Sequence, residues 1–320
     1  MNIELTSRHT PGANVSQTAD GWRMDIPAGP RGGYRLAQLD DYGRAATYHS
    51  MRLPRRAFPW DSPLTPREPR GVALSLRARA SDASLPGTWG FGLWNDPFGS
   101  AQGKPFGFAI GFGGTARRLP ALPNTAWFFH ASPESYLSLQ PCHCEEQSDE
   151  AIPSQAQEIA SLSYPPGQAG TPALAGGARE ERPRNDTPPN GFFAGTFRSP
   201  RWPSPLLAPA LLALPFLALR PTSRLLRRLA SHVVRQDGSA VSVDVTQWHE
   251  YSIRWQTGAV LFFVDNAEIL RTPLVPRGPL GLVLWIDNQY AAWRPDGRLG
   301  YGTLANPAAW LEIENIVASG

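Results

Sequence analysis

Apolar and polar residues alternate along short runs in the first 135 residues and again after residue 236, with Gly and Pro between the runs. Val72–Ala80 (V-A-L-S-L-R-A-R-A) alternates as a strand with one buried face does. In Gly87–Trp94 the bulky residues share one face, and Gly90 and Gly92 share the other. Strands are predicted at Trp22–Ile26, Tyr34–Leu39, Val72–Ala80, Thr88–Asn95, Phe106–Phe112, Ala126–Ala131, Glu250–Trp255, Val260–Val264, Ala267–Arg271, Leu280–Asp287 and Trp310–Val317.

This many strands with few helical patterns predicts an all-β fold, a two-sheet antiparallel sandwich. Asp265-Asn266, between two of the strands, is expected to form a hairpin turn. The hydrophobic content of 42% is enough for a core, and eleven tryptophans suggest aromatic-faced strands. In the predicted strand Leu280–Asp287, Val283, Trp285 and Asp287 are expected on one face, opposite Leu282, Leu284 and Ile286.

Residues 140–190 interrupt this pattern. They show no periodicity and are rich in Pro, Gly, Ala, Gln and Glu. The run C-H-C-E-E-Q-S-D-E-A-I-P-S-Q resembles the translation of a dispersed bacterial repeat element, which predicts a disordered insertion in which Cys142, His143, Cys144 and Glu145 have no function. An acidic surface loop and a regulatory metal-binding loop are the alternatives. The C-H-C run is too short for a structural zinc site, so no metal is expected.

Residues 198–235 form a second insertion, apolar and basic. Pro205–Leu219 is almost wholly apolar but shorter than the roughly 20 residues that span a bilayer. After Pro221, leucines and valines recur at helical spacing between arginines, with Ser223 as the expected N-cap. The helix is expected either to pack its leucines over the sandwich as a lid or to lie on an anionic membrane surface.

Charge is unevenly distributed along the chain. Arg198–Arg235 holds seven arginines and no acid, whereas Gln140–Asn190 holds eight acids against three arginines, and the formal net charge is +3. The remaining chain is close to neutral, so no nucleic-acid partner is expected. The N-terminal residues show no signal-peptide pattern, which predicts a cytoplasmic protein, peripheral at the membrane if the helix binds lipid.

Three segments resemble the concanavalin A-like lectin/glucanase superfamily, and glycoside hydrolase family sixteen in particular. They are G-T-W-G-F-G-L-W-N-D (87–96), W-H-E-Y-S-I-R-W (248–255) with V-L-F-F-V-D-N-A-E-I-L (260–270), and W-L-E-I-E-N-I-V (310–317). The resemblance covers roughly 200 residues and implies a jelly-roll sandwich. It predicts one sandwich domain made of residues 1–139 and 236–320, interrupted by the two insertions.

The catalytic signature of that family, E-x-D-x-x-E or E-x-D-x-E, is absent from the chain. Where that strand is expected stands Trp127-Phe-Phe-His-Ala-Ser-Pro-Glu134, in which His130 and Glu134 do not make a two-carboxylate site. Glu312 and Glu314 are expected to be solvent-facing residues on an edge strand. Asp96, Glu134 and Asp287 remain weak catalytic candidates.

Aromatic and amide residues gather at the ends of two predicted strands. Sugars stack on aromatic rings and hydrogen-bond to planar polar groups, so these residues are candidates for a carbohydrate or glycolipid site; the alternative is that the tryptophans are core anchors. The candidates are Trp94, Asn95, Asp96, Trp285, Asp287, Asn288, Gln289, Tyr290 and Trp293.

Three functions remain open at this point. The first is a non-catalytic carbohydrate-binding module, and the second is a divergent glycosidase or lyase that acts on a polysaccharide. The third is a structural or partner-binding sandwich. Motifs for nucleotide binding, zinc proteases and serine hydrolases are absent, and no cofactor is expected.

Overall fold

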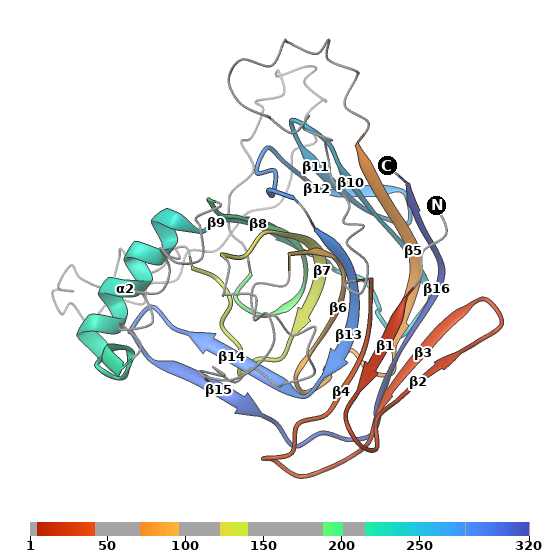
Figure 1. Ribbon diagram of the computed structural model, residues 1–320, viewed down its shortest axis with the longest axis horizontal. Coiled ribbons are helices and arrows are strands. Elements are labelled where there is room, and N and C mark those ends of the chain that lie inside the picture. The colour runs from red at the N-terminus through yellow and green to blue at the C-terminus, as the bar shows by residue number, and fades with distance from the viewer. Residues whose placement is uncertain are drawn as a thin grey trace, which may run out of the picture. The chain divides into compact units, whose positions relative to one another are not determined.

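The computed structural model describes residues 5–41, 71–95, 122–139, 188–200, 215–278 and 280–319. Seven antiparallel strands form one sheet, which we call the front sheet. In spatial order they are β1 (Thr6–His9), β4 (Leu36–Asp40), β13 (Gly281–Asp287), β6 (Thr88–Trp94), β7 (Thr125–Ala131), β8 (Gly191–Arg198) and β9 (Arg235–Ala240). The front sheet curves strongly in Figure 1. β13, from the C-terminal part of the chain, therefore lies between β4 and β6.

Seven further strands form the back sheet, also antiparallel. In order they are β12 (Ala267–Thr272), β11 (Val260–Val264), β10 (His249–Trp255), β5 (Val72–Ala80), β16 (Ala309–Ser319), β3 (Gly21–Ile26) and β2 (Asn14–Gln17). A separate hairpin consists of β14 (Gln289–Trp293) and β15 (Leu299–Thr303), and the short 3-10 helix η2 (Pro215–Ala218) precedes helix α2 (Arg220–Val233). The predicted all-β sandwich of two antiparallel sheets is confirmed.

The core lies between the two sheets and follows from the alternation along each strand. Trp89, Phe91 and Leu93 of β6 face the back sheet, and Leu74 and Leu76 of β5 face the front sheet; each is at most 2% exposed. Burying one large apolar side chain contributes roughly 1.5–3 kcal/mol. The interdigitated rows of the two inner faces thus provide the main stabilisation of the sandwich.

The sequence pattern located most of these strands within one or two residues. Val72–Ala80 and Val260–Val264 have the predicted bounds, and Asp265-Asn266 forms the predicted turn with φ of 49° and 66°. The strand predicted at Phe106–Phe112 lies outside the described residues, and so do residues 140–187, including Cys142, His143, Cys144 and Glu145. The predictions for this insertion therefore stay predictions.

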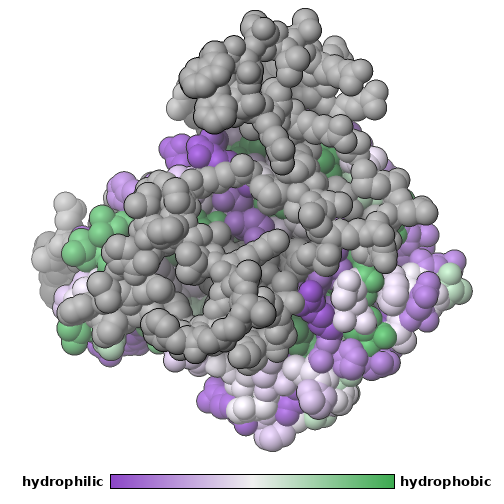
Figure 2. All heavy atoms as spheres, viewed as in Figure 1, coloured by the Kyte–Doolittle hydropathy of each residue, from purple (hydrophilic) through white to green (hydrophobic). Residues whose placement is uncertain are grey.

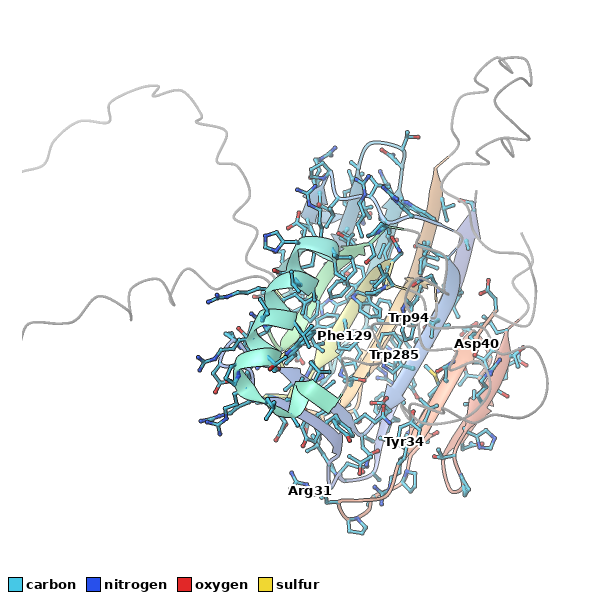
Figure 3. All side chains as sticks on the ribbon, turned by 60° about the vertical axis from the view of Figure 1, so that its left-hand side comes forward. Arg31, Tyr34, Asp40, Trp94, Phe129 and Trp285 are labelled. Carbon is cyan, nitrogen blue, oxygen red and sulfur yellow. The ribbon has the colours of Figure 1, made fainter. Side chains whose placement is uncertain are left out.

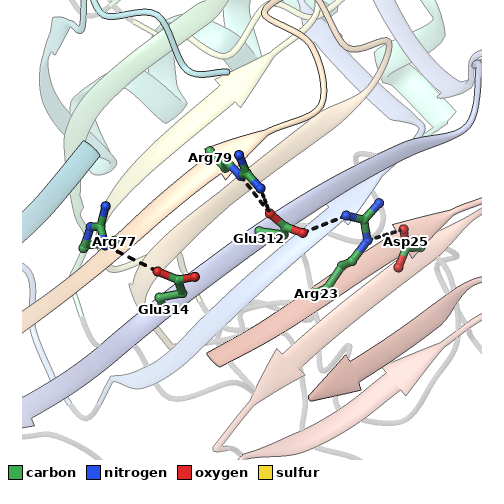
Figure 4. Close-up of polar contacts among 6 residues, drawn as sticks. All are labelled: Arg23, Asp25, Arg77, Arg79, Glu312 and Glu314. Atoms are coloured by element: carbon green, nitrogen blue, oxygen red, sulfur yellow. Dashed lines mark hydrogen bonds and ion pairs between the residues drawn. The ribbon is translucent and has the colours of Figure 1, made fainter. Parts of the chain in front are cut away.

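The outer face of the back sheet carries a ladder of paired charges (Figure 4). Glu312 of β16 accepts hydrogen bonds from Arg23 at 2.7 Å and from Arg79 at 2.8 Å, and Glu314 pairs with Arg77 at 3.5 Å. Arg79 also lies 4.8 Å from the centroid of the Trp248 ring. The prediction that Glu312 and Glu314 lie on an edge is wrong, because β16 pairs with β5 on one side and β3 on the other.

Helix α2 starts earlier and faces differently than its sequence suggests. The N-cap is Leu219, without a side-chain cap, so the prediction of Ser223 as N-cap is wrong; Ser223 lies in the first turn and is buried. Leu225 and Leu229 are 56% and 55% exposed, while Arg227 is buried. Figure 2 shows hydrophobic side chains at the surface over this helix. Leu225 and Leu229 therefore face solvent, while Leu226 is half-buried.

Candidate functional site

The face of the front sheet that is turned away from the back sheet is aromatic. We call it the aromatic face; its rings belong to Trp94, Trp127, Phe129, Phe193, Phe197 and Trp285. The ring centroids of Trp127 and Trp285 are 5.7 Å apart, and those of Trp94 and Trp127 are 5.6 Å apart. Figure 3 shows Trp94, Phe129 and Trp285 together on this face. The outer face of an antiparallel sheet is often polar, so the aromatic composition of this face is unusual.

Glycines beneath the aromatic face make room for its rings. A Cβ at Gly90 of β6 would lie 2.8 Å from Cη2 of Trp285 and would clash with the carbonyl oxygen of Phe128. Trp285 therefore lies flat against β6, and its Nε1 donates a hydrogen bond to Thr88 Oγ1 at 3.0 Å. Trp127 and Trp285 are only 8% and 6% exposed, so these two rings act as a second core, while Trp94 is half-buried.

The aromatic face also carries two buried carboxyl groups, one on β4 and one on β13. Asp40 of β4 is fully buried, pairs with Arg8 at 2.8 Å and accepts a hydrogen bond from Gln38 at 2.7 Å. Asp287 of β13 accepts hydrogen bonds from the Thr88 hydroxyl at 2.8 Å and the Gln289 backbone N–H at 3.0 Å. Burial raises the pKa of Asp287 from 3.8 to about 7, since three hydrogen bonds offset the desolvation only in part.

These two carboxyl groups are too far apart for a glycosidase pair. Asp40 is opposite Val283, four residues from Asp287 along β13, which corresponds to about 13 Å. Retaining and inverting glycosidases place their carboxyl groups about 5–5.5 Å and about 6.5–9.5 Å apart, respectively. On β7 the same face carries Trp127 and Phe129 and no acid among its described residues.

His130 of β7, which lies in the segment where the catalytic strand was expected, faces the core. Its ring stacks on Trp89 with centroids 5.3 Å apart, and burial lowers the pKa of His130 to about 4. His130 therefore packs within the core and is not on the aromatic face. In the described part of the chain, no three His, Cys, Asp or Glu side chains come together as a metal site requires.

The hairpin β14–β15 borders a groove. The ring of Tyr290 lies against β15, where a Cβ at Gly300 or Gly302 would come within 3.3 Å of it. Both glycines are therefore needed for the ring to lie flat on the backbone. We call the space beside it, about 290 Å³, the Tyr290 groove; it is lined by Arg31, Glu134, Tyr290, Ala292, Arg294, Arg298, Leu299 and Gly300.

The opposite face of the hairpin binds helix α2. Trp293 donates from Nε1 to Ser223 Oγ at 3.0 Å, and its carbonyl oxygen accepts from Arg227 Nε at 3.0 Å. Arg227 also donates to the Ser138 carbonyl oxygen at 2.8 Å. Trp293 is therefore a structural anchor between the hairpin and the helix.

The remaining candidate residues mostly hold loops. Asn288 is fully buried, accepts from Arg35 N–H at 2.9 Å and donates to the carbonyl oxygens of Gly33 and Leu304, both at 2.8 Å. Asn95 joins the ends of β6 and β7 by accepting from Asn124 N–H at 2.9 Å. Gln289 is half-buried at the start of β14, and Asp96 lies outside the described residues.

The candidate residues between Trp285 and Trp293 therefore do not form one site. Trp285 and Asp287 belong to the aromatic face, Tyr290 to the groove and Trp293 to the helix contact. Sequence reasoning missed the three arginines of the Tyr290 groove, which come from two separate loops. The Gly-Tyr-Gly run at Gly300–Gly302 was a signal for it, because alternating glycines on a strand mark a close approach.

Comparisons with known proteins give fold-level likeness only. No family model and no curated protein matches the chain. A Bacillus licheniformis β-glucanase is similar over 100% of this chain and 94% of its own, at 10% identity and a TM-score of 0.40. An endo-β-1,4-glucuronan lyase from Trichoderma reesei covers 98% and 90% (10% identity, TM-score 0.39), and the carbohydrate-binding module CBM66 from Bacillus subtilis covers 98% and 95% (6%, 0.35). At this level the likeness carries no argument about activity, and the resemblance to family sixteen stays a prediction.

Proposed function

We propose that this protein is a carbohydrate-binding module and that the saccharide lies in the Tyr290 groove. The observation that carries the proposal is the Tyr290 ring, fixed flat against Gly300 and Gly302 while it lines the groove. A sugar ring stacks its C–H face on such an aromatic surface. Because the ring is fixed before the ligand arrives, little side-chain entropy is lost on binding.

Polar groups around this ring suit sugar hydroxyl groups. Glu134 offers carboxylate oxygens as acceptors, and Arg294 and Arg298 offer N–H donors at the rim of the groove. The groove volume of about 290 Å³ is just below the range for small-molecule sites, about 300–1,000 Å³, which suits a small saccharide unit.

Binding to polysaccharides, with and without the ring, tests the proposal. We expect Tyr290→Ala to lose retention on the polysaccharide that the wild-type protein binds, by roughly two- to tenfold, since stacking contacts contribute about 0.5–1.5 kcal/mol. Tyr301→Ala is the matched control, because Tyr301 is on β15 of the same hairpin and is 81% exposed. Equal loss in both variants, or none in Tyr290→Ala, contradicts the proposal. Reducing ends released in the same wells would show hydrolysis and favour the divergent glycosidase.

A second role, attachment to an anionic membrane, is favoured by one observation. Leu219, Leu225 and Leu229 are 58%, 56% and 55% exposed, and Arg220, Arg224 and Arg228 lie between them on a segment without acids. Leucines beside arginines suit the interface of an anionic bilayer. No described helix is long and apolar enough to span a bilayer, so attachment would be peripheral.

Liposome flotation tests whether the exposed leucines of α2 bind a membrane or only face solvent. We expect the wild-type protein to float with vesicles containing phosphatidylserine and Leu225→Gln/Leu229→Gln to remain at the bottom. Val317→Gln is the control, since Val317 is an equally exposed apolar residue (59%) on the back sheet. Absence of flotation of the wild-type protein at low salt removes the membrane role.

A further inference from the structure

Three arginines and one glutamate supply the charged groups of the Tyr290 groove. Arg31 comes from the loop before β4, Arg294 and Arg298 come from the turn between β14 and β15, and Glu134 comes from the turn after β7. The lining therefore has an excess of two positive charges. An electropositive groove attracts a ligand of opposite charge, and low-dielectric walls strengthen that attraction.

Contacts with the protein hold two of these guanidinium groups in place. Arg294 donates from Nη2 to the Glu134 carbonyl oxygen at 3.3 Å, and its guanidinium lies 5.8 Å from the Tyr136 ring centroid. Arg298 pairs with Asp296 at 2.9 Å, but both side chains are largely exposed, at 62% and 41%. Exposed pairs of this kind contribute little, about 0–1 kcal/mol, so a ligand can replace Asp296 at small cost.

Arg31 is exposed, and its loop is fixed. Gly32 N–H donates to Thr303 Oγ1 of β15 at 3.0 Å, and Gly29 forms a bridge with Asn306. Among the described residues Arg31 has no ion-pair partner. Its position beside the hairpin therefore leaves a guanidinium available at the mouth of the groove.

We propose that the ligand of the Tyr290 groove is an anionic saccharide, with its ring on Tyr290 and its acidic group at Arg31 and Arg298. This inference rests on the proposed carbohydrate-binding function. Guanidinium groups bind carboxylate and sulfate groups through two parallel, charge-assisted N–H donors, whereas the hydroxyl oxygens of a neutral sugar accept such donors without the charge attraction. Glu134 opposes the anion and limits the affinity, while it remains an acceptor for hydroxyl groups.

Matched polymers and matched variants test this assignment. The probes are dextran, dextran sulfate and a polyuronate, compared by affinity electrophoresis at equal chain length. The variant is Arg31→Gln/Arg298→Gln, and its control is Arg254→Gln/Arg271→Gln, which removes the same charge from exposed positions of the back sheet. The polyuronate and dextran sulfate distinguish carboxylate from sulfate as the recognised group.

We expect the wild-type protein to bind one anionic polymer at least tenfold more tightly than dextran, and we expect 0.5 M salt to weaken that binding. The groove variant should lose most of this difference, the back-sheet control should keep it, and Glu134→Gln should increase the affinity several-fold. Equal losses in both double variants would indicate general charge attraction and overturn the inference. Tyr290-dependent binding of dextran at an affinity equal to that of the anionic polymers overturns this inference alone, whereas binding of no saccharide overturns it together with the proposed function.

Discussion

Asp287 lies where β13 leaves the aromatic face, and its buried carboxyl group makes stability depend on pH. The pKa of Asp287 is about 7 in the folded protein because of burial, against 3.8 when the group is exposed. Below about pH 4 the carboxyl group is protonated in both states and has no effect. As the pH rises from 4 to 7, the unfolded chain loses this proton first, so the free energy of unfolding falls. Above pH 7 the full penalty applies.

The size of the penalty follows from the two pKa values. One pKa unit equals about 1.36 kcal/mol, so the rise from 3.8 to about 7 corresponds to at most about 4 kcal/mol. Asp287→Asn removes the charge and keeps an oxygen that can accept from the Thr88 hydroxyl and the Gln289 N–H. We therefore expect the variant to be more stable than the wild type at pH 8, by about 1–4 kcal/mol, and to differ little at pH 4.

Denaturant unfolding followed by tryptophan fluorescence at pH 4, 6 and 8 measures this difference. Asp20→Asn is the control, because Asp20 is an exposed carboxyl group on the same chain. A second group, Asp41, also has its pKa raised, to about 6, by burial and by the charge of Asp40, but the comparison of variant with wild type cancels its contribution. A difference between Asp287→Asn and wild type that is equal at pH 4 and pH 8 would refute the reasoning.

Three further perturbations test the packing around the site. Gly90→Ala should lower the free energy of unfolding by roughly 1–3 kcal/mol in thermal or chemical unfolding, since its Cβ would meet the Trp285 ring and the Phe128 carbonyl oxygen of the neighbouring strand β7. Arg227→Met should cost roughly 1–3 kcal/mol and speed tryptic cleavage within α2, because two carbonyl oxygens lose their donor. Glu312→Gln should lower the melting temperature more at pH 7 than at pH 3. Although partial burial alone would raise the pKa of Glu312, the hydrogen bonds from Arg79 and Arg23 hold it below 4.5 and their stabilisation is lost as the pH falls through it.

The alternation of apolar and polar residues predicted the strands that bury one face, because such a strand needs an apolar residue at every second position. β5 and β11 have the predicted bounds, and the two faces of β13 are assigned correctly. β1 (T-S-R-H) and β2 (N-V-S-Q) were missed because these short strands have no apolar row. The hairpin β14–β15 was missed for a related reason: its small residues and glycines make room for one ring and give no hydrophobic pattern.

The orientation of α2 could not be predicted from its own residues. Leucines at helical spacing predict a buried apolar side, yet the helix buries Ser223 and Arg227. The reason lies in other segments, since Trp293 provides a donor for Ser223 and Trp293 and Ser138 provide carbonyl oxygens for Arg227. Such long-range hydrogen bonds leave no periodic signal in the sequence. Likewise, the residues around Arg31 give no indication that Arg31 lines the same groove as Arg294 and Arg298, which lie some 260 residues later in the chain.

The strand β14 contributes side chains both to the proposed saccharide groove and to the contact with helix α2. Tyr290 and Ala292 face the groove, and Trp293, one position further along, contacts α2. Because side chains alternate between the faces of a strand, a shift of the hairpin that accommodates a ligand on one face also changes the helix contact on the other. The buried guanidinium of Arg227 resists such a shift, since its two carbonyl partners belong to different segments. The helix that presents exposed leucines to solvent therefore contacts the same strand that carries Tyr290.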